Sequence, residues 1–273
     1  MVIRMAEYEI AVIGGDKRTA YMIPFFKEKG YRVIGYKIHA EECAASLKQA
    51  VESAEIIVGG IPIEKKGIVN VRELSRHIRK CHRIFGGLIP EPFRQECNER
   101  GILCYDFMKD ESIAIFNAVA TAEGAILKAM LHKQTNIHRS KSLVLGYGRC
   151  GKVLAEKLKG LSAEVTVCGN NAAELALAQA LGMETLALKE LAGKAAEFEY
   201  IYNTIPALVM DDEILKRIKK ETLLVDIASG KGGIDYKKAK EMQVQALHCL
   251  GLPGKYAARV SAERLADYVI KKL

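Results

Sequence analysis

Short apolar runs alternate with longer amphipathic stretches along the whole chain. In the first half, the apolar runs that predict buried strands are Ile10–Ile13, Arg32–Tyr36, Glu55–Val58, Arg83–Phe85 and Ile102–Tyr105. The stretches between them that predict helices include Lys17–Lys29, Val71–Cys81 and Pro92–Arg100. Strands separated by helices indicate a parallel sheet that is covered by helices on both faces.

The second half of the chain repeats this pattern. Its predicted strands are Ser142–Leu145, Glu164–Cys168, Tyr200–Thr204, Leu223–Ile227 and Val244–His248. Two such series of strands, each with helices between them, favour two Rossmann-like units. The sequence therefore predicts an α/β protein with two doubly wound parallel-sheet domains.

A helix is expected between the two domains, because Asn117–Gln134 has no Pro or turn cluster and is rich in Ala, Leu and Lys. A second helix is predicted for Ala257–Leu273, where small and apolar residues recur with helical spacing. The expected division is residues 1–116 for an N-terminal flavodoxin-like or Rossmann-like domain, 117–135 for the interdomain helix, 136–256 for the second domain and 257–273 for the C-terminal helix. We expect this last helix to pack back on the N-terminal domain.

Composition gives little support for a nucleic-acid partner. The chain has 273 residues, of which 49% are hydrophobic, and a formal net charge of +8. Its basic residues are spread out and form no basic tail. The densest group, Arg76–Arg83, fits a solvated helix face that leads into a strand. An anionic small molecule remains compatible with this charge.

The cysteine pattern points to a reducing compartment. There are seven cysteines, and none of them forms a C-x-x-C pair, which favours free thiols in the cytoplasm over a disulfide framework. The histidine spacing predicts no metal site. No apolar run has the length of a membrane span, and the N-terminus leads into a strand without a signal-peptide layout. We therefore expect a cytoplasmic protein with neither metal nor membrane partner.

A glycine-rich loop is the strongest functional signal. The segment Gly146-Tyr147-Gly148-Arg149-Cys150-Gly151 matches G-x-G-x-x-G and lies between a predicted strand and a predicted helix at Lys152–Lys159. Glycines at these three positions permit a tight turn, a close approach of backbone N–H groups to a pyrophosphate, and close packing of helix on strand. The following helix N-terminus favours phosphate. The loop thus predicts dinucleotide binding, with a ligand-free tight turn as the alternative.

The end of the next strand bears on the choice of cofactor. NAD-binding domains carry an acid there, which binds the ribose 2′-hydroxyl. This strand ends in Gly169-Asn170-Asn171 and has no carboxylate. Nothing at this position repels a 2′-phosphate, which favours NADP, although no arginine sits at the strand end to pair with it. NAD remains the alternative, and Arg149 could reach across to the phosphate.

Later strand ends of the second domain carry further candidate cofactor residues. These are Asn203-Thr204-Ile205-Pro206, Asp226-Ile227-Ala228-Ser229 and Gly251-Leu252-Pro253. Ligands of open parallel sheets bind beyond the carboxyl ends of the strands. We therefore expect these three corners to border the nicotinamide and the substrate, which makes residues 136–256 the NAD(P)-binding domain; ordinary turns are the alternative.

The first domain has its own glycine turn, at Gly14-Gly15-Asp16-Lys17-Arg18. It lacks the third glycine of a dinucleotide loop. Lys17 and Arg18 lie at a predicted helix N-terminus, where a carboxylate is well placed. This corner is a candidate for substrate binding, and a solvated first helical turn is the alternative.

Taken together, these segments resemble the family of the bacterial dipicolinate synthase A subunit. The resemblance is carried by IAVIGGDKR at Ile10–Arg18, ESIAIFNAVATAEGAI at Glu111–Ile126, LGYGRCG at Leu145–Gly151, NTIPALV at Asn203–Val209, DIASGKGGIDY at Asp226–Tyr236 and GLPGKYA at Gly251–Ala257. The chain departs from the family pattern at Ala120, where proline is usual, at Gly230-Lys231, where Arg-Pro is frequent, and in Ala257–Ala262 after GLPG.

The resemblance implies an NAD(P)-dependent oxidoreductase with domains like those of D-2-hydroxyacid dehydrogenases. The implied reaction oxidises a dihydrodipicolinate-type cyclic dicarboxylate to pyridine-2,6-dicarboxylate in the mother cell of a sporulating bacterium. The implied partner is the flavoprotein-like B subunit of dipicolinate synthase, and a homo-oligomer is left open. The alternatives are a dehydrogenase of another 2-hydroxy, 2-imino or shikimate-type acid, and a non-catalytic NADP-binding assembly subunit.

The chemistry of aromatisation suggests which side chains to look for. It needs a base for a ring proton and cations for two carboxylates. The candidate catalytic residues are Glu123, Lys231 and Lys255, with Glu123 as base or orienting group. Asn117 and Thr121, from the interdomain helix, are further candidates for substrate binding.

Overall fold

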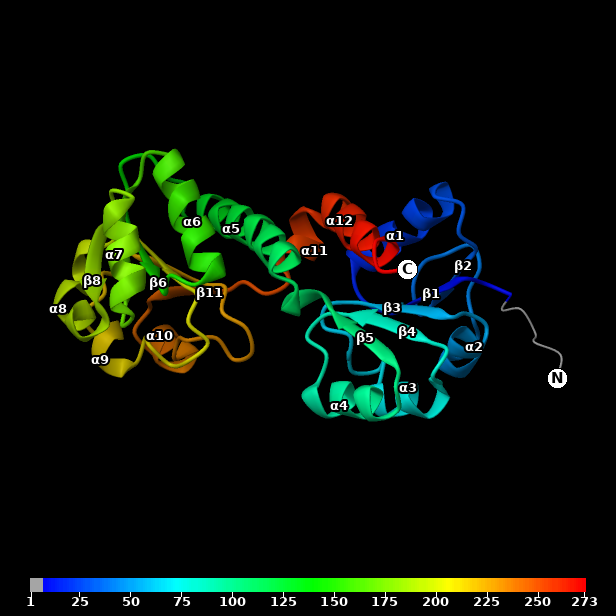
Figure 1. Ribbon diagram of the computed structural model, residues 1–273. Coiled ribbons are helices and arrows are strands. Elements are labelled where there is room, and N and C mark those ends of the chain that lie inside the picture. Colours follow the sequence, from blue (N-terminus) through cyan, green and yellow to red (C-terminus); the bar gives the residue numbers. More distant parts are fainter. Residues whose placement is uncertain (1–6) are drawn as a thin grey trace. The chain divides into compact units, whose positions relative to one another are not determined.

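Residues 7–273 are described by a computed structural model. They form two units (Figure 1). Unit 1 comprises the chain up to Ala114 together with Ala257–Leu273, and unit 2 comprises Ile115–Tyr256. The chain therefore leaves unit 1, builds all of unit 2 and then returns to unit 1 for its last helix.

Unit 1 is built on a fully parallel sheet with the strand order β2-β1-β3-β4-β5. Its strands are β1 (Ile10–Ile13), β2 (Val33–Tyr36), β3 (Ile56–Gly59), β4 (Arg83–Gly86) and β5 (Leu103–Asp106). Its helices are α1 (Lys17–Glu28), α2 (Leu47–Glu52), α3 (Val71–His77), α4 (Glu91–Glu99), the 3-10 turn η1 (Phe107–Lys109) and α12 (Ala258–Ile270). This is the flavodoxin-like strand order, in which the order reverses between β1 and β3.

Successive residues of each strand of unit 1 point to opposite faces of the sheet. On one face, Ile10 and Val12 pack with Met22 of α1 and with Leu265 and Val269 of α12. On the other face, side chains of the same strands pack with α2, α3 and α4. The C-terminal helix α12 is thus part of the hydrophobic core of unit 1.

Unit 2 has a six-stranded parallel sheet with the order β11-β10-β9-β6-β7-β8. Its strands are β6 (Lys141–Leu145), β7 (Glu164–Gly169), β8 (Glu184–Ala187), β9 (Tyr200–Asn203), β10 (Leu223–Asp226) and β11 (Gln245–His248). Its helices and 3-10 turns are α5 (Glu111–Lys133, most of which lies in this unit), α6 (Arg149–Gly160), α7 (Ala172–Ala180), η2 (Leu188–Glu190), α8 (Leu191–Lys194), η3 (Ala195–Glu197), α9 (Asp212–Leu215), α10 (Tyr236–Glu241) and α11 (Leu252–Tyr256). The order reverses between β6 and β9, as in dinucleotide-binding folds.

The predicted fold class, two parallel-sheet α/β domains, is confirmed. Several elements differ in detail, among them β8, α5 and α3. The edge strand β8 was not predicted, because Glu184–Ala187 is short and contains a single β-branched residue. Helix α5 begins at Glu111 instead of Asn117. Helix α3 ends at His77 instead of Cys81, because Ile78 has an extended backbone.

Helix α5 has the length and hydropathy of a membrane span, which the sequence prediction did not single out. Half of its most apolar stretch is buried in the protein. Ala122, Ala125, Ile126 and Ala129 belong to one hydrophobic core cluster of unit 2, together with Leu154 of α6. The core position accounts for the buried half of the helix, whereas Leu127, Met130 and Leu131 are exposed.

Candidate functional site

The register of the second sheet places four strand ends in one row. Leu145 of β6 pairs with Asn203 of β9, Asn203 pairs with Asp226 of β10, and Asp226 pairs with His248 of β11. The loops that follow these strands therefore emerge at the same edge of the sheet. The glycine loop and the loop after β9 lie on either side of the point where the strand order reverses, which is where ligands of such sheets bind.

Glycine is required at two positions of the glycine loop. Gly146 has φ +87°, and a Cβ atom there would lie 2.6 Å from the Thr204 hydroxyl oxygen. A Cβ atom at Gly151 would overlap the carbonyl oxygen of Gly146. At Gly148, by contrast, a Cβ atom would meet nothing within 4 Å. The loop is closely packed on its inner side and open at Gly148.

The N-terminus of α6 is open to an anion. Gly148 is its N-cap and makes no side-chain capping hydrogen bond, and the first turn of the helix contains no acid. Amide N–H groups and the partial positive charge of the helix are therefore available for phosphate oxygens. In unit 1, the N-terminus of α1 is closed, because the Asp16 carboxylate accepts a hydrogen bond from the Arg18 amide at 2.9 Å. The geometry fits a pyrophosphate at α6 and not at α1.

Two side chains of the glycine loop point into the protein. Tyr147 is buried, its hydroxyl donates to the Met183 sulfur at 3.9 Å, and burial raises the pKa of Tyr147. Burial also raises the pKa of the partly buried Cys150 thiol. Tyr147 is thus fully buried and Cys150 partly buried, whereas Gly148 and Arg149 are exposed.

The end of β7 is organised by Asn171. Its Oδ1 accepts hydrogen bonds from the amides of Ala173 and Glu174, at 3.0 and 3.2 Å, and so caps α7. Asn170 is exposed, and the Cβ position of Gly169 is open. The oxygen of Asn171 is thus used by the fold, which leaves its amide nitrogen to act on a ligand.

A buried carboxylate joins the loops after β9 and β10. Asp226 is fully buried. Its Oδ1 accepts from Asn203 Nδ2 and from the Ala228 amide, both at 2.9 Å. Its Oδ2 accepts from the Gly233 amide and from the Tyr236 hydroxyl, both at 2.7 Å. Burial and the hydrogen bond to Asp226 raise the pKa of Tyr236. We call this group the Asp226 cluster.

Asn203 is committed to the same cluster. Its Nδ2 also donates to the Ile205 carbonyl at 3.0 Å, and its Oδ1 accepts from the Ile205 amide at 3.1 Å. A Cβ atom at Gly233 would lie 2.5 Å from Asn203 Nδ2. The side chains of Asn203 and Asp226 therefore shape the rim, and their direct contact with a cofactor stays a prediction.

The remaining rim residues divide into buried and exposed groups. Ile227, Ala228, Leu252 and Pro253 are buried, and Thr204 and Ile205 are partly buried. The Thr204 hydroxyl donates to the Leu145 carbonyl at 2.8 Å. The exposed members are Pro206, Ser229, Lys231, Gly251 and Lys255. These exposed residues can meet a ligand without rearrangement of the loops.

The candidate base Glu123 has a partner elsewhere on unit 2. Its carboxylate forms an ion pair with Lys157 at 2.7 Å, in the last turn of α6. Gly148 lies at the opposite end of that helix, on the order of 13 Å away at 1.5 Å per residue. Thr121 donates to the Asn117 carbonyl at 2.8 Å, along α5. Catalytic and substrate roles for these residues stay predictions.

Arg18 is turned inward at the candidate substrate corner of unit 1. It is 4% exposed, and its guanidinium donates through Nη2 to Asp16 Oδ2 at 2.8 Å and to the Ile61 carbonyl at 3.1 Å. Burial acts to raise the pKa of Asp16, but hydrogen bonds and charge from Arg18 outweigh it and lower that pKa. Lys17 is the exposed cation of this pair.

Lys65 joins this corner and was not found from the sequence. Its Nζ donates to the Gly15 carbonyl at 3.4 Å and is exposed. A Cβ atom at Gly60 would lie 2.5 Å from the Gly15 Cα, so the loops after β1 and β3 touch backbone to backbone. Lys65 lies fifty residues after Gly15, and only the fold brings them together.

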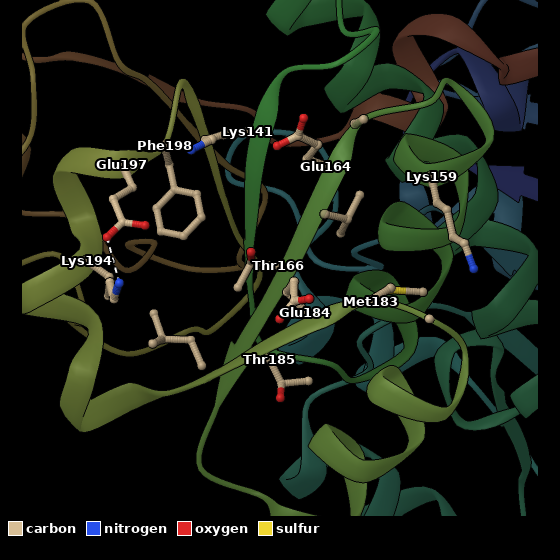
Figure 2. Close-up of a pocket in the computed structure, with 14 residues that line it drawn as sticks. Lys141, Lys159, Glu164, Thr166, Met183, Glu184, Thr185, Lys194, Glu197 and Phe198 are labelled. Carbon is tan, nitrogen blue, oxygen red and sulfur yellow. Dashed lines mark ion pairs between the residues drawn. The ribbon is translucent and has the colours of Figure 1, made fainter.

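A cavity of about 600 Å³ lies elsewhere on unit 2 (Figure 2). It is lined by Lys141, Glu164 and Glu184, the first residues of β6, β7 and β8, and by the Lys194–Glu197 ion pair. It therefore lies toward the amino ends of the strands, away from the glycine loop, and is no part of the dinucleotide site. Within residues 7–273, no three His, Cys, Asp or Glu side chains are grouped to hold a metal.

Comparison with known proteins gives consistent matches. The profile of a family described as the N-terminal domain of the dipicolinate synthase A subunit matches residues 9–108. The dipicolinate synthase A subunit of Bacillus subtilis (strain 168) is 35% identical over 284 aligned positions, which cover 97% of this chain and 95% of that protein.

Solved structures agree with this. The crystal structure of the dipicolinate synthase A subunit from Bacillus halodurans has a TM-score of 0.84 and 25% identity, and the match covers 98% of both chains. The crystal structure of transhydrogenase from Sinorhizobium meliloti has a TM-score of 0.69 at 16% identity, covering 97% of this chain and 93% of that one. The second match shows a shared fold alone.

Proposed function

The chain belongs to the family of the dipicolinate synthase A subunit, and we propose that it oxidises a dihydrodipicolinate-type cyclic dicarboxylate to pyridine-2,6-dicarboxylate. The observation that carries this proposal is the open N-terminus of α6 at Gly148, which suits the pyrophosphate of a nicotinamide cofactor. The B subunit of dipicolinate synthase is the proposed partner, and the cytoplasm of a sporulating bacterium the proposed location.

In this reaction the ring loses a hydride and a proton and becomes aromatic. A bound nicotinamide would accept the hydride. The chain's own residues would position the cofactor: backbone amides of the glycine loop would hold the pyrophosphate, and the Asp226 cluster fixes the loops after β9 and β10. The exposed cation Lys17 of unit 1 is the proposed partner of a substrate carboxylate, and the exposed Lys231 and Lys255 of unit 2 keep the candidate catalytic roles expected from the sequence.

We propose NADP as the preferred cofactor. The end of β7 presents Asn170 and Asn171 and no carboxylate, so a 2′-phosphate meets no repulsion there. The amide nitrogen of Asn171 can donate to a phosphate oxygen while its Oδ1 caps α7.

Cofactor titration tests this preference. Asn171→Asp keeps a cap for α7, because aspartate accepts the same hydrogen bonds, but adds a negative charge. We expect NADP affinity to fall by about tenfold, or roughly 1.4 kcal/mol, with NAD affinity maintained. The matched control is Asn70→Asp, since Asn70 caps α3 through the same two contacts in unit 1. Equal NADP and NAD affinities that Asn171→Asp leaves unchanged would remove the NADP preference.

The reaction itself is tested by adding freshly made dihydrodipicolinate and NADP to the protein together with the B subunit. We expect an absorbance gain at the reduced-nicotinamide band. If the absorbance rises only with another 2-hydroxy, 2-imino or shikimate-type acid, the protein is an oxidoreductase but the proposed substrate is wrong.

A non-catalytic NADP-binding assembly subunit is the second candidate. The observation in its favour is the Glu123–Lys157 ion pair, which holds the candidate base at the end of α6 remote from Gly148. If the protein binds NADP normally but shows no turnover, with or without the B subunit, the non-catalytic role is supported.

A further inference from the structure

Leu88 has an unusual combination of backbone conformation and exposure. Its φ is +51°, in the left-handed region, and its side chain is 55% exposed. The other non-glycine residues with positive φ among residues 7–273 are all polar: Lys37, Gln134, Arg139, Ser162 and Gln243. A bulky apolar residue rarely adopts this conformation, because its Cβ crowds the following carbonyl.

A buried carboxylate imposes this conformation. Asp106, at the end of β5, is 8% exposed. Its Oδ1 accepts from the amides of Leu88 and Met108, at 3.1 and 2.8 Å. Its Oδ2 accepts from the Ile89 amide at 2.9 Å. Ile89 is 6% exposed and packs in the core, whereas its neighbour Leu88 is exposed and does not belong to that core cluster.

The loop is also fixed on its other side. The Gly87 amide donates to the Gly60 carbonyl at 2.9 Å, and the Gly87 carbonyl accepts from the Ile63 amide at 2.8 Å. The loop after β4 is thus joined to the loop after β3 as well as to β5. Leu88 is a single apolar side chain held exposed on a rigid backbone, and packing within unit 1 does not explain it.

Leu88 lies on the same edge of the sheet as the candidate substrate corner. It follows β4, whereas Gly15 and Lys17 follow β1, and β3 lies between these strands. Two strand spacings separate the loops by about 10 Å. Lys65, whose Nζ reaches the Gly15 carbonyl, adds a second exposed cation on the side of the corner. Leu88 and the two exposed lysines therefore belong to loops at one edge of the sheet.

We propose that Leu88 packs against the flat face of the substrate ring, and that Lys17 and Lys65 bind its carboxylates. This inference rests on the proposed function, and it makes Leu88 a specificity residue for cyclic over acyclic dicarboxylates. A planar ring offers an apolar face that a flexible chain of the same carbon number does not. The left-handed backbone at Leu88 is then retained because it presents the side chain to the ligand.

The test uses Leu88→Asn and Leu88→Gly, because asparagine and glycine both accept the left-handed backbone. We expect the dissociation constant of pyridine-2,6-dicarboxylate, measured by calorimetry, to rise about tenfold, since burial of a leucine side chain is lost. The KM for the cyclic substrate rises with it. The affinity for pimelate, an acyclic dicarboxylate, and the affinity for NADP stay unchanged, and the thermal midpoint does not fall.

Leu103→Asn is the matched control. Leu103 is 50% exposed and lies in unit 1, but it is the first residue of β5, at the amino ends of the strands. We expect this variant to bind pyridine-2,6-dicarboxylate like the wild type. An equal loss in the two Asn variants would overturn the inference.

Other outcomes separate this inference from the proposed function. Wild-type affinity for pyridine-2,6-dicarboxylate in both Leu88 variants overturns the inference and leaves the reaction standing. An equal loss for pimelate also overturns it, because Leu88 would then support the loop and not the ring. Loss of association with the B subunit or with a second copy, at unchanged dicarboxylate affinity, assigns Leu88 to an interface instead. Leu88-dependent ring binding in a protein without turnover supports the inference and refutes the reaction.

Discussion

His82 is a buried imidazole in unit 1 whose two nitrogens are both engaged. Its Nδ1 accepts from the Arg79 amide at 2.7 Å, so its Nε2 carries the proton and donates to the Val51 carbonyl at 3.1 Å. The ring joins the ends of α2 and α3 to the start of β4. Burial lowers the pKa of His82 below its ordinary value of 6.5.

This neutral histidine makes the stability of unit 1 depend on pH. The unfolded chain takes up a proton as pH falls through 6.5, whereas the folded chain resists protonation until a lower pH. The free energy of unfolding is therefore expected to be highest above pH 6.5 and to decrease below it. Urea unfolding between about pH 5 and pH 8 measures this slope.

His82→Asn should flatten the slope at the cost of lower stability at pH 8. His39→Asn is the control, because His39 is exposed in the same unit. If the free energy of unfolding of the His82 variant still decreases below pH 6.5 as in the wild type, groups other than His82 cause the pH dependence.

At this scale, sequence patterns predict local geometry better than side-chain partners. The spacing of Gly146, Gly148 and Gly151 indicates the turn because all of its atoms come from a few successive residues. The inward turn of Arg18 could not be predicted, because one acceptor is the carbonyl of Ile61, 43 residues later. The position of Lys65 could not be predicted either, because its acceptor, the Gly15 carbonyl, lies fifty residues earlier.

At the scale of elements, the Asp226 cluster holds two loops of unit 2 with one carboxylate. Asp226→Asn replaces an acceptor oxygen by an NH2 group that faces buried donors. We expect it to lower the free energy of unfolding by about 1–3 kcal/mol, as an unsatisfied buried group does. Amide exchange of Ala228 and Gly233 should become faster, since their acceptor is weakened.

Tyr236→Phe is the graded control, because it removes one of the four hydrogen bonds to Asp226. We expect a loss of about 1 kcal/mol and little change in exchange at Ala228. Equal effects of the two substitutions would contradict the view that the carboxylate organises both loops.

The same scale shows what apolar patterns miss. Buried strands such as β1 and β10 are recognised because every residue in them is buried and apolar except the last of β10. The edge strand β8 has no fully buried residue and therefore no continuous apolar run. The loop clusters escape such patterns as well, because residues such as Asn203 and Asp226 look like ordinary turn residues until the register places them side by side.

At the scale of the whole molecule, unit 1 is assembled from two distant parts of the chain. Leu265 of α12 is 6% exposed and packs with Ile10 and Val12 of β1. We expect Leu265→Ala to lower the free energy of unfolding of unit 1 by about 2–4 kcal/mol. Hydrogen exchange should accelerate in β1 and α1 and remain unchanged in β6 and β9.

Leu154→Ala is the reciprocal substitution, because Leu154 is fully buried in unit 2. It should accelerate exchange in β6 and β9 instead. If either substitution accelerated hydrogen exchange equally in both sheets, the two units would not unfold independently.

Because α12 belongs to the core of unit 1, the two units can be completed only in a certain order during synthesis. A chain emerging from the ribosome has completed unit 2 at Tyr256, but unit 1 still lacks the helix that covers Ile10 and Val12. The apolar residues of β1 therefore lack their covering helix until α12 has been made, while unit 2, encoded between them, can already fold. During synthesis, the apolar face of β1 is the surface that a chaperone would have to protect.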